Sequence, residues 1–440
     1  MMPDYELLTS KIEHIVGREY LYYSHGGFLD FAVDGKVPGL LVYPANLDEV
    51  SAILRVANEE VASICPWSQG TKIVIGNIPK SLDIILFTSR LNNVIEHDQG
   101  NLTVTLEAGV KLSELQSLIK DKKQFLPLDP MFSSRCSIGG VIASNSNGPR
   151  RLRYGSVRDL LIGIKAVLPT GEGIKAGGKV VKNVAGYDMC KLFVGSFGTL
   201  GIITEATFKL YPLPEVEKTV LLSFENSAQA FEFISRLLES VVLPSSLEAL
   251  NYSTIKVLSK KIDISFMENT CCLVIRLEGF EESVKRECDE IQKMGIGYAR
   301  ILEGPEQEGF WTELSDFPYL VGSNFRFKVS APTSITFDIF NKVDEYSKNL
   351  GVSISLISHA GSGIVYGFLS TEEVDKLIQF INELGSHVAE AGGYFVVESA
   401  STEIKHKVNI WGHLPGGVEI MRKIKGSFDP KGLMSPGRLL

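Results

Sequence analysis

Glycines and short polar residues gather at residues 66–77, in the pattern of a turn that could hold an anion. The stretch reads PWSQGTKIVIGN, with Gly70 and Gly76 among mostly small or polar neighbours. Consecutive backbone N–H groups converge in such a turn and can bind a pyrophosphate. An ordinary hairpin fits these residues equally well. The Rossmann fingerprint G-x-G-x-x-G is not met here, because a strand-like sequence rather than a helix follows the turn.

A second segment of this kind covers residues 129–155, which are rich in Gly, Ser, Asn, Arg and Pro. The pair Gly139–Gly140 lets the backbone lie flat against a ligand, and the Ser and Asn side chains supply hydrogen-bond donors. A loop this long inside a globular domain is usually functional. A glycine-rich crossover loop without a ligand is the alternative. Two further glycine-rich strings follow at residues 177–188 (GGKVVKNVAGYD) and 195–204 (GSFGTLGIIT).

Composition limits the classes of function. The chain has 440 residues, more than one core usually serves, so we expect two domains. A net charge of −8 argues against a nucleic-acid partner, which needs a basic face. None of the six cysteines has C-x-x-C spacing, so the sequence predicts no metal site of the zinc or iron–sulfur kind. Scattered cysteines are typical of a reducing cytosol.

The sequence predicts no integral membrane segment. Residues 1–17 are charged and amphipathic and lack the apolar h-region of a secretory signal. The apolar runs are too short to span a bilayer. We therefore expect a cytoplasmic protein that would reach a membrane only peripherally, through partners.

Hydrophobic periodicity places these segments on elements of an α+β fold. Helices are expected at 5–16, at 47–60 with Asn46 as N-cap, and at 111–123. A strand, a loop and a second strand are expected across residues 61–76 (VASICPWSQGTKIVIG), and residues 125–155 show little regular pattern. Beyond Pro212 and Pro214, strands are expected at 218–224, 271–278, 298–303, 323–330, 352–357, 363–369 and 394–398. Helices are expected at 227–239, 281–294, 337–350 and 371–391. This alternation predicts an antiparallel sheet backed by helices.

The four glycine-rich segments, in this order and spacing, resemble the FAD-binding domain of the vanillyl-alcohol oxidase and p-cresol methylhydroxylase (PCMH) type. Within that family, the string GGKVVKNVAGYDMCKLFVGSFGTLGIITEATFKLYPLP looks like the smaller flavin-binding subunit of glycolate oxidases. The strings NGPRRLRYGSVRDLL and FDPKGLMSPGRLL are similar too. The resemblance implies a two-subdomain PCMH-type FAD-binding domain at 1–215, an α+β cap domain at 216–395 and a tail at 396–440 that returns toward the flavin.

The resemblance also implies the residues that hold FAD. The pyrophosphate loop would consist of Trp67, Ser68, Gln69, Gly70 and Thr71, closed by Gly76. The ribityl and flavin region would be lined by Pro130, Ser137, Gly139, Gly140, Ser144 and Asn145. The same loop would be closed by Gly148, Tyr154 and Gly155. The adenine or flavin edge would lie beside Gly198, Gly201, Ile202 and Ile203. Lys182, Asn183, Tyr187 and Asp188 match a family motif near the flavin.

This chain departs from the family pattern in its pyrophosphate loop, where Trp67, Ser68 and Gln69 replace the usual glycines. Many relatives attach FAD covalently through a histidine in or near this loop. None of the seven histidines lies between residues 60 and 76, so we expect non-covalent FAD.

The candidate catalytic residue is His359. Catalytic 2-hydroxyacid dehydrogenases of this superfamily carry a stretch resembling HAGDGNLH and a later Glu-His pair, which bind a metal or the substrate. Here the stretch reads HAGSGIVY and the later pair reads Glu398-Ser399, so only the first histidine remains. One histidine and one glutamate make a poor divalent site, and we predict no metal. His359 could accept the substrate's proton or could be structural.

Two further groups stay open between a functional and a structural role. Arg150, Arg151 and Arg153 could attract a carboxylate substrate, contact a partner or form a solvated face. Lys405, Trp411 and His413 could face the flavin through the tail or pack at the surface.

Three functions follow as alternatives. The first is an FAD-bearing subunit of a glycolate oxidase or dehydrogenase complex, with a catalytic flavin subunit and an iron–sulfur subunit as partners and glycolate or another small 2-hydroxyacid as substrate. The second is a self-sufficient FAD-dependent 2-hydroxyacid dehydrogenase. The third is a degenerate flavin-binding assembly subunit.

Overall fold

The first of two sheets in the N-terminal lobe leads into the turn at residues 66–77. The computed structural model describes residues 3–178, 188–262, 270–295, 300–413 and 416–439. This sheet has the order β1-β2-β4-β3, with β3 and β4 parallel. Its strands are β1 (Leu21–Tyr23), β2 (Leu40–Val42), β4 (Ile84–Phe87) and β3 (Ile64–Trp67).

Two helices cover this sheet, α1 (Tyr5–Val16) and α2 (Leu47–Glu59), as the sequence predicted. The Asn46 side chain accepts a hydrogen bond from the Glu49 backbone N–H (2.9 Å) and caps α2. The apolar faces of both helices are buried against the strands.

A second sheet of the N-terminal lobe has the order β5-β6-β10-β8-β9 and is antiparallel throughout. Its strands are β5 (Val94–Asp98), β6 (Thr103–Glu107), β10 (Ile202–Lys209), β8 (Leu161–Val167) and β9 (Gly173–Gly177). Around them lie α3 (Leu112–Lys120), α4 (Ile138–Ala143), α5 (Arg151–Tyr154), α6 (Val157–Leu160), α7 (Met189–Phe193) and the small pair β7 (Gln124–Phe125) with β11 (Tyr211–Pro212).

Two expectations for this lobe are wrong in detail. Residues 71–77 form turns instead of a strand, and the next strand is β4. The segment 125–155 is not wholly irregular, because α4 and α5 interrupt it. Ser137 caps α4, and its hydroxyl accepts from the Gly140 N–H (3.3 Å).

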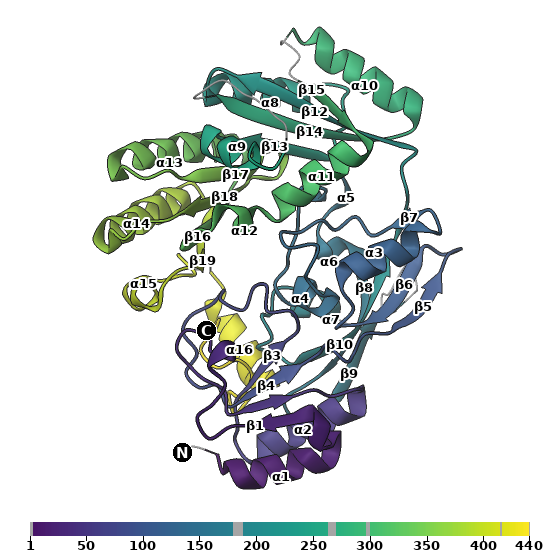
Figure 1. The fold of residues 1–440 in the computed structure, drawn as a ribbon, viewed down its shortest axis with the longest axis vertical. Helices are drawn as coiled ribbons and strands as arrows, with labels where there is room; N and C mark the ends of the chain where they lie inside the picture. Colours follow the sequence, from purple (N-terminus) through teal and green to yellow (C-terminus); the bar gives the residue numbers. More distant parts are fainter. Residues whose placement is uncertain (1–2, 179–187, 263–269, 296–299, 414–415, 440) are drawn as a thin grey trace.

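The cap lobe is built on one eight-stranded antiparallel sheet, ordered β15-β12-β14-β13-β17-β18-β16-β19 (Figure 1). Its strands are β12 (Val216–Phe224), β13 (Ser246–Leu250), β14 (Cys271–Gly279), β15 (Arg300–Glu303), β16 (Phe325–Ser330), β17 (Ser355–His359), β18 (Ile364–Leu369) and β19 (Tyr394–Ser399). The expected antiparallel sheet is confirmed, and β13 is a strand that the sequence pattern did not predict.

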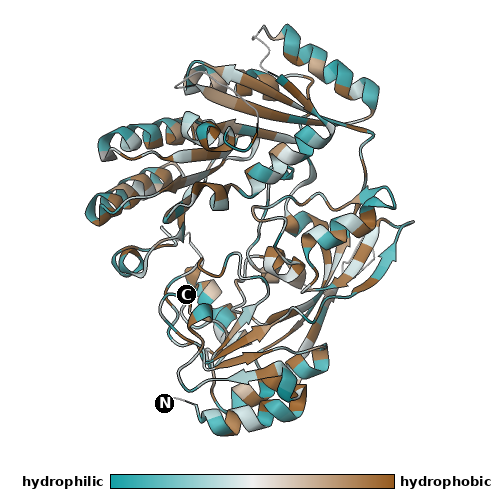
Figure 2. Cartoon of the chain, in the orientation of Figure 1, coloured by the Kyte–Doolittle hydropathy of each residue, from teal (hydrophilic) through white to brown (hydrophobic). Residues whose placement is uncertain are grey.

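Helices cover both faces of the cap sheet. The outer face packs on α8 (Ser227–Leu238), α10 (Glu281–Lys293), α13 (Thr336–Leu350) and α14 (Val374–Glu390), at the four predicted positions. The inner face, toward the N-terminal lobe, packs on α9 (Tyr252–Leu258), α11 (Gly304–Ser315) and α12 (Phe317–Val321). Figure 2 shows this arrangement: the strands of the cap sheet are mostly hydrophobic (brown), and the helices beside them have a hydrophilic (teal) side.

The chain after β19 returns to the N-terminal lobe through α15 (Thr402–Lys407) and α16 (Val418–Phe428), the yellow segment in Figure 1. Ile64 of β3 donates its N–H to the Leu433 carbonyl, and its own carbonyl accepts from Ser435, both at 2.8 Å. Within the described ranges, no helix has the length and apolarity needed to cross a bilayer.

Candidate functional site

A small cavity lies beyond the C-terminal end of β3, where three of the four glycine-rich segments meet. Its volume is about 130 Å³. Most of the residues expected to hold FAD line it: Trp67, Ser68, Gln69, Gly70, Thr71, Ser137, Gly139, Gly140, Ser144, Gly198, Gly201, Ile202 and Ile203. We call this cavity and its lining the cradle.

Two glycines of the cradle have a left-handed backbone and tight surroundings. Gly70 has φ 68° and Gly198 has φ 66°. A Cβ atom on Gly198 would lie 2.8 Å from the Pro66 ring, and one on Gly70 would lie 2.8 Å from the Trp67 ring. Glycine is therefore required at both positions by conformation and by space.

The loop after β3 offers free donors to an anion. Among the described residues, the backbone N–H groups of Ser68, Gln69, Gly70 and Thr71 have no acceptor within the protein. The Ser68 hydroxyl is buried and also lacks a partner. A buried hydroxyl without a partner is costly, so the Ser68 side chain and the neighbouring unpaired N–H groups fit a ligand such as a pyrophosphate. The loop thus suits FAD although it is poor in glycine.

Six expected FAD-binding residues do not line the cradle: Gly76, Pro130, Asn145, Gly148, Tyr154 and Gly155. Gly76 accepts from the Lys405 ammonium (3.2 Å), and Tyr154 packs between Phe125 and Tyr211. Asn145 accepts from the Asn147 side chain (2.9 Å), and Gly148 lies against Asp129 in a second cavity. Pro130 lines neither cavity.

Sequence reasoning missed other members of the cradle lining: Pro66, Lys72, Ile73, Thr88, Ala143 and Phe197. Pro66, Lys72 and Ile73 adjoin the predicted loop, and Phe197 lies inside the GSFGTLG string. Thr88 follows β4, whose parallel pairing with β3 brings the ends of both strands together. Of the family motif at 182–188, Lys182, Asn183 and Tyr187 lie outside the described residues.

The tail fixes the segment that follows the cradle loop. Buried Lys405 and Arg438 both pair with Asp34, at 2.8 Å and 2.9 Å. Lys405 also donates to the Val74 and Gly76 carbonyls, and Arg438 donates to those of Ile73, Ile75 and Asn77. Trp411 donates to the Arg438 carbonyl (3.1 Å) and contacts Phe197 edge-on, so it reaches the cradle only through another side chain.

Replacing Asp34 by asparagine is expected to destabilise the protein by about 3–5 kcal/mol, because Lys405 and Arg438 would be left buried without their carboxylate. Denaturant unfolding measures this change in the free energy of unfolding. Asp30→Asn, at an exposed position nearby, is the control. Equal unfolding free energies for the two variants would contradict this role of Asp34.

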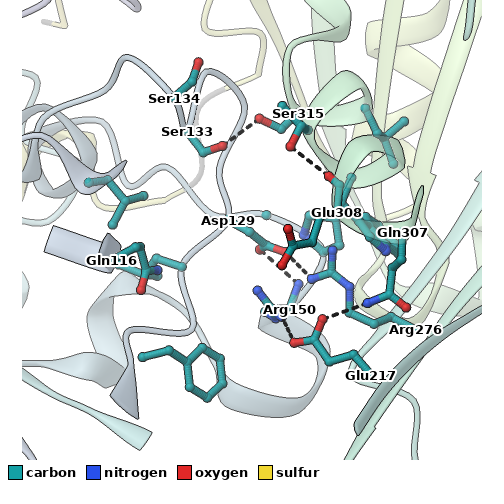
Figure 3. Close-up of a pocket in the computed structure, with 18 of the residues that line it drawn as sticks. Gln116, Asp129, Ser133, Ser134, Arg150, Glu217, Arg276, Gln307, Glu308 and Ser315 are labelled. Atoms are coloured by element: carbon teal, nitrogen blue, oxygen red, sulfur yellow. Dashed lines mark hydrogen bonds and ion pairs between the residues drawn. The ribbon is translucent and has the colours of Figure 1, made fainter. Parts of the chain in front are cut away.

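A second, larger cavity of about 740 Å³ lies between the lobes (Figure 3). On one side it is lined by α3 and the 128–150 segment, and on the other by α11 and the inner face of the cap sheet. Ser133 and Ser315 join the two lobes across it through their hydroxyls (2.8 Å). We call this space the interlobe cavity.

Several charged side chains that line the interlobe cavity form ion pairs. Arg276 binds Asp129 (3.1 Å), and Arg150 binds Glu217 and Glu278. Burial and the neighbouring Arg150 lower the pKa of Arg276 to about 10, against the raising effect of the carboxylates. Two of the three arginines considered as ligands of a substrate carboxylate already have partners within the protein. Arg150 pairs with Glu217 and Glu278, and Arg153 donates to the Glu278 carbonyl.

His359 lies at the end of β17 and lines the interlobe cavity together with Glu248 of β13. Its Nδ1 is 2.6 Å from the Glu248 carboxylate, and both side chains are buried. A carboxylate accepts, so Nδ1 carries the hydrogen and Nε2 is left as an acceptor. Burial raises the pKa of Glu248, while the neighbouring His359 lowers it. The pair has the arrangement of a histidine base oriented by a carboxylate.

Comparison with known proteins agrees with this architecture. Residues 38–177 match the family model of the FAD binding domain, and residues 213–439 match that of the C-terminal domain of FAD linked oxidases. The chain is 31% identical to the glycolate oxidase subunit GlcD of Bacillus subtilis, over 98% of this chain and 96% of that one. It is 28% identical to a D-lactate dehydrogenase of Archaeoglobus fulgidus, over 91% of each.

Solved structures show the same fold. The p-cresol methylhydroxylase structure with substrate bound superimposes with a TM-score of 0.76 at 18% identity, covering 99% of this chain and 96% of that one. An alkyldihydroxyacetonephosphate synthase superimposes with a TM-score of 0.74 at 19% identity, covering 99% and 85%. The PCMH-type fold expected from the sequence is therefore confirmed.

Proposed function

Because the chain belongs to the family of FAD-linked oxidases, we propose that it oxidises the CH–OH group of a small 2-hydroxyacid. FAD is held non-covalently in the cradle, and the substrate enters the interlobe cavity beside His359. Glycolate and D-lactate are the first candidates, since relatives carry the names glycolate oxidase and D-lactate dehydrogenase.

The observation that carries this proposal is that one segment of the chain, residues 128–150, contributes to the lining of both cavities. Ser137, Gly139 and Gly140 line the cradle, while Asp129 and Gly148 line the interlobe cavity. One extended ligand that follows the 129–148 segment from the pyrophosphate loop can contact both. The Glu248–His359 pair lines the second cavity, where we expect the substrate to bind.

In this proposal FAD and the Glu248–His359 pair have separate roles. When bound, FAD supplies the acceptor for a hydride from the alcohol carbon. Nε2 of His359 takes the hydroxyl proton, and Glu248 stabilises the imidazolium that results. The cap lobe buries this pair away from bulk water, which strengthens its electrostatic interaction.

The purified protein is expected to be yellow, with one FAD per chain that acid precipitation releases into the supernatant. The reason is that, among the described residues, the cradle lining contains no histidine, cysteine or tyrosine that could form a covalent link. Absorbance spectra before and after precipitation measure both points. Flavin that stays with the pellet would contradict non-covalent binding, and colourless protein that takes up no added FAD would contradict the cofactor site.

Substrate oxidation is tested by anaerobic mixing with glycolate, D-lactate and a panel of other 2-hydroxyacids. Loss of the oxidised flavin absorbance with one of them is the expected result. Full retention of that absorbance with the whole panel would contradict the proposed activity.

A role inside a complex is the second candidate, and the full-length match to a protein named as a glycolate oxidase subunit favours it. The partners would be a catalytic flavin subunit and an iron–sulfur subunit that accepts the electrons. Co-purification from the native source tests this. Recovery only as a monomer that turns over substrate unaided would favour a self-sufficient enzyme. The Glu248–His359 pair supports that alternative, because it supplies a base within this chain.

A further inference from the structure

In the part of the chain that the structure describes, the inner face of the cap sheet lacks the ligands that a divalent metal needs. Nδ1 of His359 is bound to Glu248, and Tyr366 replaces the second histidine of the stretch that catalytic relatives carry. Glu398 is 3.1 Å from the Arg326 guanidinium, with both side chains buried. Over the described ranges, no group of three or more His, Cys, Asp or Glu side chains lies close enough to hold a metal.

Cations are gathered on this face instead. Lys328 of β16 lies opposite Tyr366 of β18 and opposite Val396 of β19. Directly paired residues of antiparallel strands point to the same face, as do alternate residues of one strand. Lys328 therefore shares the inner face with Tyr366. Glu398 lies on the same face, because it stands two residues after Val396 in β19.

The positive charges near Glu398 outnumber the single carboxylate. Arg326 is paired with Glu398, and Lys72 lines the cradle, where a pyrophosphate would offset its charge. Lys328 forms no hydrogen bond or ion pair with any described residue, and its ammonium lies 5.7 Å from the centre of the Tyr366 ring. Among the described residues, its charge has no carboxylate of its own.

A partly buried ammonium without a carboxylate partner is unfavourable, and a bound anion removes that penalty. Burial, reinforced by the charges of Lys72 and Arg151, lowers the pKa of Lys328 to about 8, although Glu398 acts in the opposite direction. The side chain is therefore still charged at neutral pH. This combination fits a site that is completed by an anionic group of a ligand.

We propose that Lys328, supported by Arg326, binds the carboxylate group of the substrate on the inner face of the cap sheet, in the role that a divalent metal could otherwise take. Binding and oxidation by this chain therefore need no metal ion. This inference rests on the proposed function for the identity of the substrate, whereas the anion site itself rests on the residues above.

The test uses the FAD-loaded protein and oxalate, a dicarboxylate with no CH–OH group to oxidise. Isothermal titration and the perturbation of the flavin spectrum measure its affinity. Lys328→Met is expected to weaken oxalate binding at least tenfold. Lys376→Met, which removes an exposed lysine of α14, is the control and should leave the affinity unchanged. Treatment with EDTA should have no effect on the wild type.

The pH dependence gives an independent readout. The groups facing Lys328 are Tyr366, Glu398, Arg326, Lys72 and Arg151. Oxalate binds the charged ammonium, so its affinity should be level below about pH 7 and should fall toward tenfold per unit above the pKa of Lys328. In Lys328→Met this decline should be absent.

Two outcomes would overturn the inference: oxalate affinity unchanged in Lys328→Met, or affinity that EDTA abolishes and added Zn²⁺ or Mn²⁺ restores. Failure of the proposed function looks different. In that case no 2-hydroxyacid reduces the flavin, while oxalate binding still depends on Lys328.

Discussion

Replacing His359 by glutamine is expected to slow flavin reduction by the 2-hydroxyacid substrate about 10²–10⁴-fold, because the hydroxyl proton loses its acceptor. FAD content and the flavin spectrum should not change, since His359 lies in the interlobe cavity and not in the cradle. Anaerobic stopped-flow absorbance gives the rate constant directly. Glu248→Gln should also slow reduction, by a smaller factor, because the imidazole keeps its place but loses the carboxylate that stabilises its charge.

His387→Gln is the matched control for this variant. It makes the same chemical change on α14, where His387 pairs with Asp338 away from both cavities. Its reduction rate should equal that of the wild type. If His359→Gln behaves like this control, His359 has a structural role and the proton leaves by another route.

The second large effect concerns the cradle. Gly198→Ala is expected to weaken FAD binding at least tenfold, or about 1.4 kcal/mol. A left-handed backbone costs a non-glycine residue about 1–2 kcal/mol, and here the added Cβ also meets the Pro66 ring at 2.8 Å. Any shift that relieves this contact moves a wall of the cradle. Titration of the apoprotein with FAD, followed by flavin fluorescence, measures the affinity.

Gly17→Ala separates backbone strain from damage to the cradle. Gly17 has φ 83° and ends α1, and a Cβ atom added there would have no neighbour within 4 Å, so this position shares the positive φ but not the crowding. This variant should lose some stability and keep its affinity for FAD. Circular dichroism should first show that both variants are folded. Equal FAD affinities for the two would then contradict the role of Gly198 in shaping the cradle.

Local sequence patterns were sufficient for much of the fold. Helix α2 follows from its apolar spacing and its Asn46 cap, the cap strand β14 follows from a continuous apolar run, and β16 follows from alternating apolar and polar residues. The glycine-rich strings also pointed to the region of the cradle, since positive φ angles at Gly70 and Gly198 leave a direct mark on residue type. These features depend on neighbours in the sequence.

The features that were missed depend on residues far apart in the sequence. The pattern KIVIG after Gly70 favours a strand, yet Arg438 and Lys405 take the carbonyls of residues 73–76 and hold the segment in turns. Strand β13 carries the charged Glu248, which a buried strand tolerates only because His359, 111 positions later, pairs with it. The charge balance around Lys328 likewise appears only once β16, β18 and β19 are side by side.

The tail contacts also set an order of events during synthesis. The segment after the cradle loop receives its hydrogen bonds from Lys405 and Arg438, which lie 329 to 365 positions further along the chain. A ribosome has made both sheets of the N-terminal lobe and the whole cap lobe before Arg438 is added. Domains generally fold as units while the chain emerges. Here, however, the segment after the cradle loop receives these hydrogen bonds only after the cap lobe has been translated. We therefore expect chains that are released before Arg438 is added to bind FAD weakly.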